Sequence, residues 1–435
     1  MIEIFRIKKI QFLLIWGLLL LSFNNNFFKT MDSQYHFDVF MDGTQSLVWG
    51  RIANSEQNGL FSDGMLMGRC YPTPKECNGN NSICAKRFQK KIFLNKYKIE
   101  NYQVYKSHPA IHTLIFTLIN TLLDYEPNVM VELFLFITAL INAFIFAILI
   151  HLIFDKYGMF IKFFIAIALI FNFWFICYGN EMYMFFGFMF LPLIITWKIF
   201  SDINAGKEIN NVQIFLYITL SVFLKYLFTG FEFISCSVLM IFIPIIYFGI
   251  DKKNYYKNVF LSGVLAGLAI VFGVIIALCV LCLQLWSLEG SFNEAFIHIF
   301  SRFMYRTAGE SAIDPEKLKV LSVLKYYLQE RAIDYNRNFQ FSFEQLVWYY
   351  IISVASLSFF KKYKSLILAS VVALLASISW LVIFRQHSVI HTHVDPIVWY
   401  MPFLFFAFAI IGLAIKELSL FFLRAYRSKR NLFIR

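Results

Sequence analysis

Long apolar stretches recur along the chain, and short polar turns separate most of them. An α-helix rises about 1.5 Å per residue, so crossing a bilayer core of about 30 Å takes roughly 20 apolar residues. This pattern predicts an all-α, polytopic transmembrane helical bundle that forms a single domain over residues 1–435. The expected spans number about ten and lie near residues 10–28, 128–154, 160–178, 181–200, 212–229, 231–250, 258–287, 343–360, 365–384 and 396–420.

Basic residues in the short connections predict the orientation, because cytoplasmic loops are enriched in Lys and Arg. With ten spans, all the basic clusters fall on one side, which makes both termini and the tail 421–435 cytoplasmic. The clusters lie at residues 6–9, 156–162, 198–207, 252–257, 361–364 and 424–435. The opposite, extracytoplasmic face, of what we expect to be a bacterial inner membrane, then holds the segments 29–127, 288–342 and 385–395.

The segment 108–124 is apolar but too short and too polar for an eleventh span. We expect a helix that lies in the membrane interface. An eleventh span would also divide the basic clusters between the two sides.

The amino-acid composition indicates which kinds of molecule this protein contacts. With 59% hydrophobic and 15% charged residues, the chain is typical of proteins whose main solvent is lipid. The net charge of +12 comes from basic residues that punctuate apolar runs and form no stripe on a soluble domain, so membrane lipids are expected partners and nucleic acid is not. Cys70, Cys77 and Cys84 share a polar stretch of the first outer segment, where one disulfide could form and leave one thiol.

The first outer segment holds two candidate catalytic carboxylates, Asp42 and Asp38. If this piece is helical, their spacing of four puts them on one face, and a carboxylate at a membrane surface can act as a general base toward a hydroxyl. Asp42 and Gln45 also fit a capping box at the start of a helix that ends near Gly59. Both interpretations stay open.

Two other outer segments hold candidate phosphate-binding residues. Arg302 and Arg306 recur on the cationic face of an amphipathic helix, which fits either a lipid-linked phosphate or general attraction to anionic headgroups. Arg385 and His387 lie in a turn with His391, His393 and Asp395 near its end. Phosphate binding by Arg385 and His387, a divalent metal site or a plain polar turn would each explain this turn, and no metal or other cofactor is otherwise expected.

Charged residues also flank the predicted spans. Lys225 and Glu232 lie at the outer ends of consecutive spans, where we expect them to pair across the turn, and Glu132 and Glu181 are also at outer ends.

Several stretches together resemble the GT-C class of glycosyltransferases, which includes protein O-mannosyltransferases and lipid A aminoarabinose transferases. They are the span 10–28, "FDVFMDGTQSLVWGRI", "HPAIHTLIFTLINTLLD", "NFWFICYGNEMYMFFGFMFLP" and "FRQHSVIHTHVDPIVWYMPF". The resemblance implies an enzyme that takes a sugar from a polyprenyl-phosphate-linked donor to an acceptor outside the cytoplasm. Asp42 or Asp38 would then be the base, and Arg302, Arg306, Arg385 and His387 would bind the donor phosphate.

Two alternatives remain at this stage. An O-antigen polymerase or ligase would also act on lipid-linked glycans with Arg and His on outer loops. A transporter or flippase would be expected to have inverted repeats and polar residues at the bilayer midplane.

Overall fold

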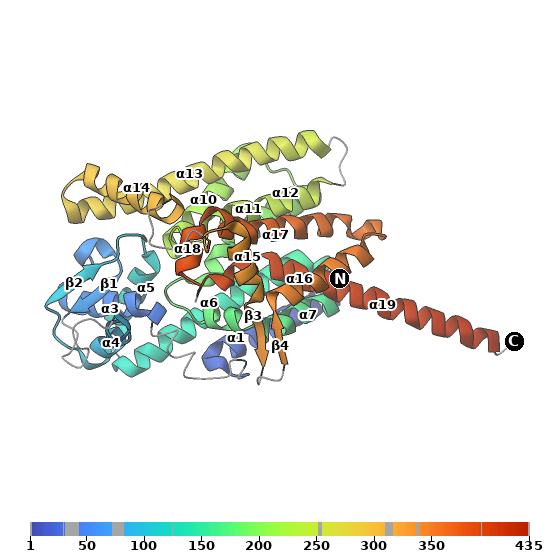
Figure 1. Cartoon of the computed structure of the whole chain (residues 1–435), viewed down its shortest axis with the longest axis horizontal. Helices are drawn as coiled ribbons and strands as arrows, with labels where there is room; N and C mark the ends of the chain where they lie inside the picture. The colour runs from blue at the N-terminus through green and yellow to red at the C-terminus, as the bar shows by residue number, and fades with distance from the viewer. Residues whose placement is uncertain are drawn as a thin grey trace.

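The computed structural model describes residues 2–28, 30, 43–71, 82–123, 125–250, 255–308, 316–335, 339–392 and 394–433 (Figure 1). Helices dominate this part of the chain, as the apolar pattern predicts, and the protein is an all-α membrane protein. Six helical segments are long and apolar enough to cross a membrane: Pro127–Tyr157, Phe186–Asn204, Asn211–Thr229, Val259–Glu289, Lys361–Ile383 and Phe403–Arg424.

These six segments correspond to six predicted spans. They are built from α6 (Pro127–Phe154) with η3 (Asp155–Tyr157), η4 (Phe186–Phe190) with α9 (Leu191–Asn204), α10 (Asn211–Thr229), α13 (Tyr255–Glu289), η5 (Lys361–Tyr363) with α17 (Lys364–Ile383), and α19 (Phe403–Phe433).

The other four predicted spans are also helical, but shorter, interrupted or less apolar. They correspond to α1 (Ile2–Phe23), to α7 (Met159–Ile170) with α8 (Phe173–Gly179), to α11 (Ile234–Met240) with α12 (Phe242–Gly249), and to α16 (Phe343–Leu357). The count of ten spans stays a prediction.

The chain is not helical between the end of α8 and the start of η4. The span predicted at 181–200 therefore begins at Phe186, later than residue 181. Asn142 of α6 bridges the break: its Nδ2 atom donates to the Gly179 carbonyl at 2.9 Å, and its Oδ1 atom accepts from the Gly187 amide at 2.8 Å. Backbone groups freed inside a membrane protein need such partners. Asn142 therefore allows residues 180–185 to leave the helix.

The described part of segment 29–127 forms a small α/β unit. It contains α3 (Ser46–Asn58), η2 (Ser62–Met65), β1 (Gly68–Tyr71), α4 (Ser82–Asn95), β2 (Asn101–Val104) and α5 (Ile111–Leu123). Strands β1 and β2 pair antiparallel, with Gly68 opposite Val104. Helix α3 ends at Gly59 with a φ of 92°, which confirms the predicted end, and α5 is a short helix of 13 residues in place of a span.

Most of the elements not yet described follow α13. They are α14 (Phe292–Ala308), α15 (Val320–Gln329), the antiparallel strands β3 (Arg331–Tyr335) and β4 (Phe339–Ser342), α18 (Arg385–Ile390) and η6 (Asp395–Tyr400). A further 3-10 turn, η1 (Asn24–Asn26), follows α1.

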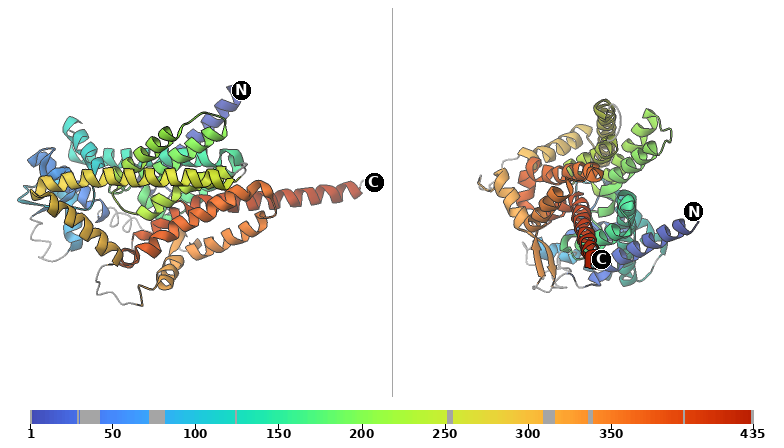
Figure 2. Two further views of the ribbon diagram at one scale, coloured as in Figure 1. Left: turned by 90° about the horizontal axis from the view of Figure 1, so that it is seen from above. Right: turned by 90° about the vertical axis from the view of Figure 1, so that its right-hand side faces the viewer.

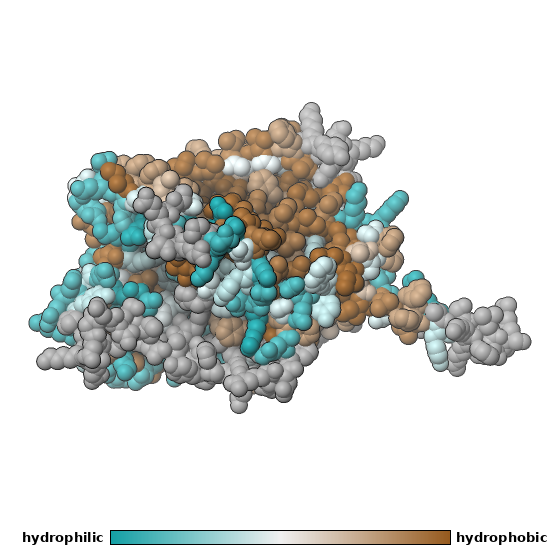
Figure 3. All heavy atoms as spheres, in the orientation of Figure 1, coloured by the Kyte–Doolittle hydropathy of each residue, from teal (hydrophilic) through white to brown (hydrophobic). Residues whose placement is uncertain are grey.

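Several basic clusters meet at one end of the bundle. Lys8 pairs with Asp155, and the neighbouring Tyr157 ring lies 6.4 Å from the ring of Tyr363 in the cluster at 361–364. Both termini lie toward this end, away from β1 and β2 (Figures 1 and 2). Hydrophobic residues gather over α13 and α17 between the ends, and hydrophilic ones over β1 and β2 (Figure 3). The clusters at residues 6–9, 156–162 and 361–364 thus lie at one end of the bundle. The grouping of the other clusters and the side that this end faces stay predictions.

Candidate functional site

A cavity of about 1830 Å³ opens at the end of the bundle opposite the termini. Its walls come from the start of α3, the paired strands β1 and β2, the break between α8 and η4, the turn after α10, helix α14, and the α18–η6 turn. The volume exceeds the roughly 300–1,000 Å³ of typical small-molecule pockets. This cavity is the candidate site.

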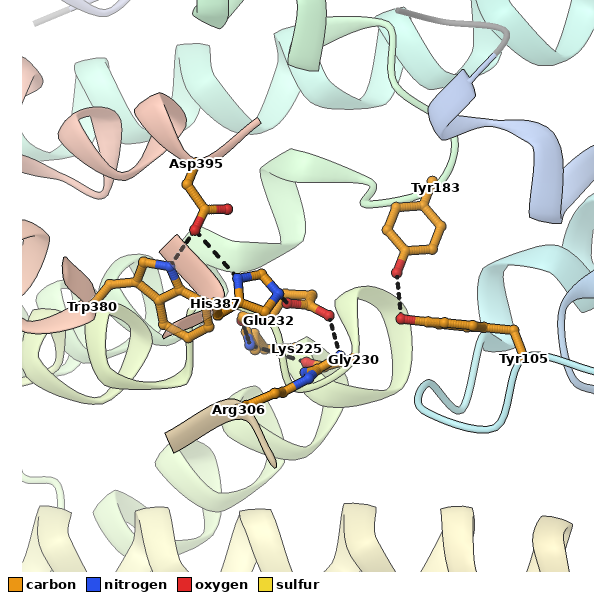
Figure 4. Close-up of polar contacts among 9 residues, drawn as sticks. All are labelled: Tyr105, Tyr183, Lys225, Gly230, Glu232, Arg306, Trp380, His387 and Asp395. Carbon is orange, nitrogen blue, oxygen red and sulfur yellow. Dashed lines mark hydrogen bonds and ion pairs between the residues drawn. The ribbon is translucent and has the colours of Figure 1, made fainter. Parts of the chain in front are cut away.

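Glu232 is the centre of a charged network at the base of the cavity (Figure 4). The Arg306 Nη2 atom donates to its Oε1 atom at 2.8 Å, and the His387 Nε2 atom lies 3.6 Å from its Oε2 atom. Burial opposes ionisation of Glu232, but the positive charges of Arg306 and His387 outweigh it and lower the pKa of Glu232 to about 2. The same contact raises the pKa of Arg306, so both partners are charged.

Asp395 contacts the ring nitrogen of His387 that faces away from Glu232. The His387 Nδ1 atom lies 3.3 Å from Asp395 Oδ2, and that oxygen also accepts from Trp380 Nε1 at 2.9 Å. Burial acts to lower the pKa of His387, but the hydrogen bond and charge of Asp395, together with Glu232, outweigh it and raise that pKa. The imidazole between two carboxylates is thus favoured as a cation, and its orientation is set by Asp395.

Glu181 is a second buried carboxylate on the cavity wall. Its side chain accepts hydrogen bonds from the Thr44 hydroxyl and, at 2.8 Å, from the Tyr183 amide. Burial outweighs these two hydrogen bonds and raises the pKa of Glu181 to about 8. A carboxyl that titrates near neutral pH is suited to accept a proton during catalysis. Thr44 also ties this carboxylate to the beginning of the α3 segment.

Cations line the cavity above this network. The Lys106 ammonium pairs with Glu289 at the end of α13. Arg302, one turn before Arg306 on α14, also lines the cavity, and no ion pair to it is found among the described residues. The site therefore offers donors to an anionic group.

The structure brings some of the predicted phosphate-binding residues together. Arg302, Arg306 and His387 all line the cavity. Arg385 does not: its Nη1 atom donates to the Leu318 carbonyl at 3.3 Å, and it lies outside the cavity wall. The α18 helix explains this difference, because residues two apart on a helix point to different sides.

The two predicted catalytic residues, Asp42 and Asp38, lie outside the described residues, as do Cys77 and His393. The described chain resumes at Gly43, which lines the cavity. Cys70 is a buried free thiol whose Sγ atom lies 3.2 Å from the Gly50 carbonyl, so it takes no part in the disulfide considered for this stretch. Within the described ranges, no three His, Cys, Asp or Glu side chains are grouped to hold a metal ion.

The expected pairing of Lys225 with the Glu232 carboxylate is wrong. The Lys225 ammonium donates to the backbone carbonyls of Gly230, at 3.1 Å, and of Glu232, at 2.8 Å. The chain turns at Gly230 with a φ of 59°, which directs these carbonyls to the lysine and leaves the carboxylate for Arg306.

Sequence reasoning placed Glu181 at an outer helix end but assigned it no role, and it grouped Asp395 only with possible metal ligands. The contact between Thr44 and Glu181 could not be read from the chain, because the two residues are 137 positions apart. The only local signal was an acidic residue next to Asn180 and Gly179 in an otherwise apolar run, which marks a break.

Comparison with known proteins assigns no family. No protein-family model, curated protein or solved structure matches this chain.

Proposed function

We propose that this protein is a membrane glycosyltransferase that moves a sugar from a polyprenyl-phosphate-linked donor to an extracytoplasmic acceptor, which is a surface glycan, a lipid or a protein. The observation that carries the proposal is the cavity at one end of an apolar helical bundle, where a buried carboxylate with a raised pKa and a fixed cationic network line the same space. A donor held in lipid requires a site at the end of the bundle.

Arg306, Arg302 and His387 are proposed to bind the phosphate of the donor. Glu232 holds one Nη atom of Arg306, and a guanidinium has five N–H donors in all, so others remain for a phosphate. As the bond between the sugar and the phosphate breaks, negative charge develops on the leaving lipid phosphate. Cations that are already positioned stabilise this charge without reorganising.

Asp42, or else Asp38, is proposed to take the proton from the acceptor hydroxyl as its oxygen bonds to the sugar. Glu181 is the described carboxylate that fits the same role, because its pKa of about 8 suits proton transfer near neutral pH. Each candidate balances the reaction: the acceptor proton goes to the carboxylate, and the electron pair of the broken bond goes to the phosphate.

The test is turnover of a panel of polyprenyl-phosphate sugars by the full chain in proteoliposomes. Asp42→Asn, Asp38→Asn and Glu181→Gln are compared with Glu316→Gln, which removes an exposed carboxylate outside the cavity. Loss of general-base catalysis lowers the rate by roughly 10²–10⁴-fold in the variant that lacks the base. Full activity in all three variants would refute the acid–base scheme.

The products separate the alternatives. A single added sugar supports the proposal, whereas a polymer or a transferred chain would identify a polymerase or ligase. Solute uptake without a donor would identify a transporter. The helix breaks at 180–185 and 230–233 line the cavity at the end of the bundle, which favours an enzyme over a transporter with a midplane site.

A further inference from the structure

Two cations with no role in the proposed chemistry lie on the part of the cavity wall that β1 and α4 form. Arg69 is on β1 and Lys86 is on α4, and both line the cavity. Burial and the nearby charge of Arg69 lower the pKa of Lys86, so the two positive groups are close enough to oppose each other's charge.

The scaffold holds these like charges together. Gln89 of α4 accepts from the Cys70 amide at 2.8 Å through Oε1 and donates to the Cys70 carbonyl at 3.2 Å through Nε2. The Gln89 side chain thus pairs with the backbone amide and carbonyl of one residue of β1, as a neighbouring strand would. Since Arg69 precedes Cys70 and Lys86 is one helical turn before Gln89, this double hydrogen bond brings the two cations to the same place.

Close backbone packing behind the wall reinforces this arrangement. A Cβ atom on Gly50 of α3 would lie 2.2 Å from the Gly68 carbonyl oxygen, so only glycine allows α3 to approach β1. The same Cβ atom would lie 2.9 Å from the Gln89 Oε1 atom of α4, so Gly50 also allows α4 to pack against β1.

Within the described part of the chain, no carboxylate compensates the charges of Arg69 and Lys86. Two other cavity cations have one, since Lys106 pairs with Glu289 and Arg306 with Glu232. Among the described residues neither Arg69 nor Lys86 forms an ion pair, and the buried Nε atom of Arg69 has no hydrogen-bond partner. Holding two partly buried like charges together costs free energy that an anion in the cavity would recover.

Neutral hydrogen-bonding groups surround the pair. Side chains two apart on a strand share a face, so Arg69 and Tyr71 point to the same side, and Gln103 lies opposite Arg69 on β2. The Tyr71 hydroxyl donates to Gln103 Oε1 at 3.1 Å, and all three line the cavity. The wall near Arg69 therefore also offers an aromatic ring, a hydroxyl and an amide to a ligand.

We propose that Arg69 and Lys86 form a subsite for an anionic group, a carboxylate or a phosphate, on the acceptor glycan. This inference rests on the proposed function and specifies it: the acceptor is acidic, and it binds at the wall formed by β1 and α4 rather than at the Glu232 network. The cavity of about 1830 Å³ has room for such an acceptor beside the donor sugar.

The experiment measures binding to the purified full chain in detergent without donor, so its result does not depend on turnover. The probes are methyl glucuronide, methyl phosphate and the neutral methyl glucoside. The variants are Arg69→Gln, Lys86→Gln and Arg69→Lys, with Lys91→Gln on the exposed side of α4 as the matched control. Thermal unfolding of each variant checks that it is folded.

Loss of one charge-assisted hydrogen bond weakens binding roughly tenfold or more. We expect this loss for the anionic probes in Arg69→Gln and Lys86→Gln, no change in Lys91→Gln, and partial recovery in Arg69→Lys. The probe that binds more tightly tells a carboxylate from a phosphate.

Equal affinity of the wild type for the neutral and anionic probes would overturn the proposal. So would unchanged anion binding in folded Arg69→Gln and Lys86→Gln. The third contrary result is a stronger effect of these variants on binding of polyprenyl phosphate than on the acidic sugar, because it would place the donor at this wall.

Discussion

Replacing Glu232 by Gln tests the charged network most directly. The substitution keeps the shape of the side chain but removes the negative charge between Arg306 and His387. Side chains of the Glu232–Arg306 pair are only 7% and 17% exposed, so the guanidinium would be left largely buried without its counter-charge.

Removal of one partner of a buried ion pair costs roughly 3–5 kcal/mol. Arg306 lines a cavity that admits water, so we expect the low end, about 3 kcal/mol. Glu316→Gln is the matched control, because its pair with Lys319 leaves the side chains 71% and 62% exposed. Such surface pairs contribute at most about 1 kcal/mol.

The assay is the unfolding midpoint of the full chain as a denaturing detergent is added to mild-detergent micelles. Glu232→Gln should unfold well before the wild type, and Glu316→Gln close to it. The double variant Glu232→Gln/Arg306→Gln should be more stable than Glu232→Gln alone, because it no longer holds an unpaired cation. A double variant that is less stable than the single one would show that the contact is not coupled as the geometry requires.

The stabilisation from the Glu232 charge should also depend on pH. Because the folded pKa of Glu232, about 2, lies below the ordinary 4.5, the stabilisation from its charge is present above pH 4.5 and is lost as the pH falls toward 2. The difference between the wild type and Glu232→Gln should therefore shrink in that window.

Three further predictions concern the cavity wall and the orientation. The pKa of Glu181 in the folded protein is about 8, against the ordinary 4.5, so ionisation of Glu181 destabilises the wild type as the pH rises from 4.5 to 8. Between pH 5 and 8.5, the unfolding midpoint of Glu181→Gln should therefore drop less than that of the wild type. Gly50→Ala should lower the free energy of unfolding by about 1–3 kcal/mol, because the added Cβ would meet a carbonyl oxygen at 2.2 Å. The control Gly267→Ala should be neutral or stabilising, because a Cβ there would have no atom within 4 Å. Reporter fusions after residues 60 and 205 should report opposite sides of the membrane, and the same side for both would refute the predicted orientation.

Most of the helical architecture follows from local sequence. Apolar runs of spanning length predict α6, α10, α13, α17 and α19 because a helix satisfies its own backbone within one segment, and lipid rewards a continuous apolar surface. The end of α3 follows from another local signal, a glycine that can end a helix with a positive φ. The short length of α5 follows from an apolar run that is too short to span.

The interruptions were not predictable in this way. The run at 160–200 is mostly apolar, with Asn180 and Glu181 as its only local sign of a break, and the chain leaves the helix at residues 180–185. This break depends on Asn142 of another helix, which bonds to Gly179 and Gly187. A partner on a distant segment leaves no periodic signal near the break.

In the candidate site, too, some residues were predictable from local sequence, whereas their partners were not. The basic face of α14 and the polar turn at 385–395 identified Arg302, Arg306 and His387, because clusters of charge at the ends of apolar runs are visible in sequence. Their partners were decided by tertiary structure: Glu232 is 74 positions from Arg306, and Thr44 is 137 from Glu181. The sequence by itself determined that charged groups gather at one end of a lipid-embedded bundle. Only the packing of the helices and their breaks decided which charges pair, which stay unpaired, and which face the cavity, because these contacts join segments whose local patterns are independent of one another.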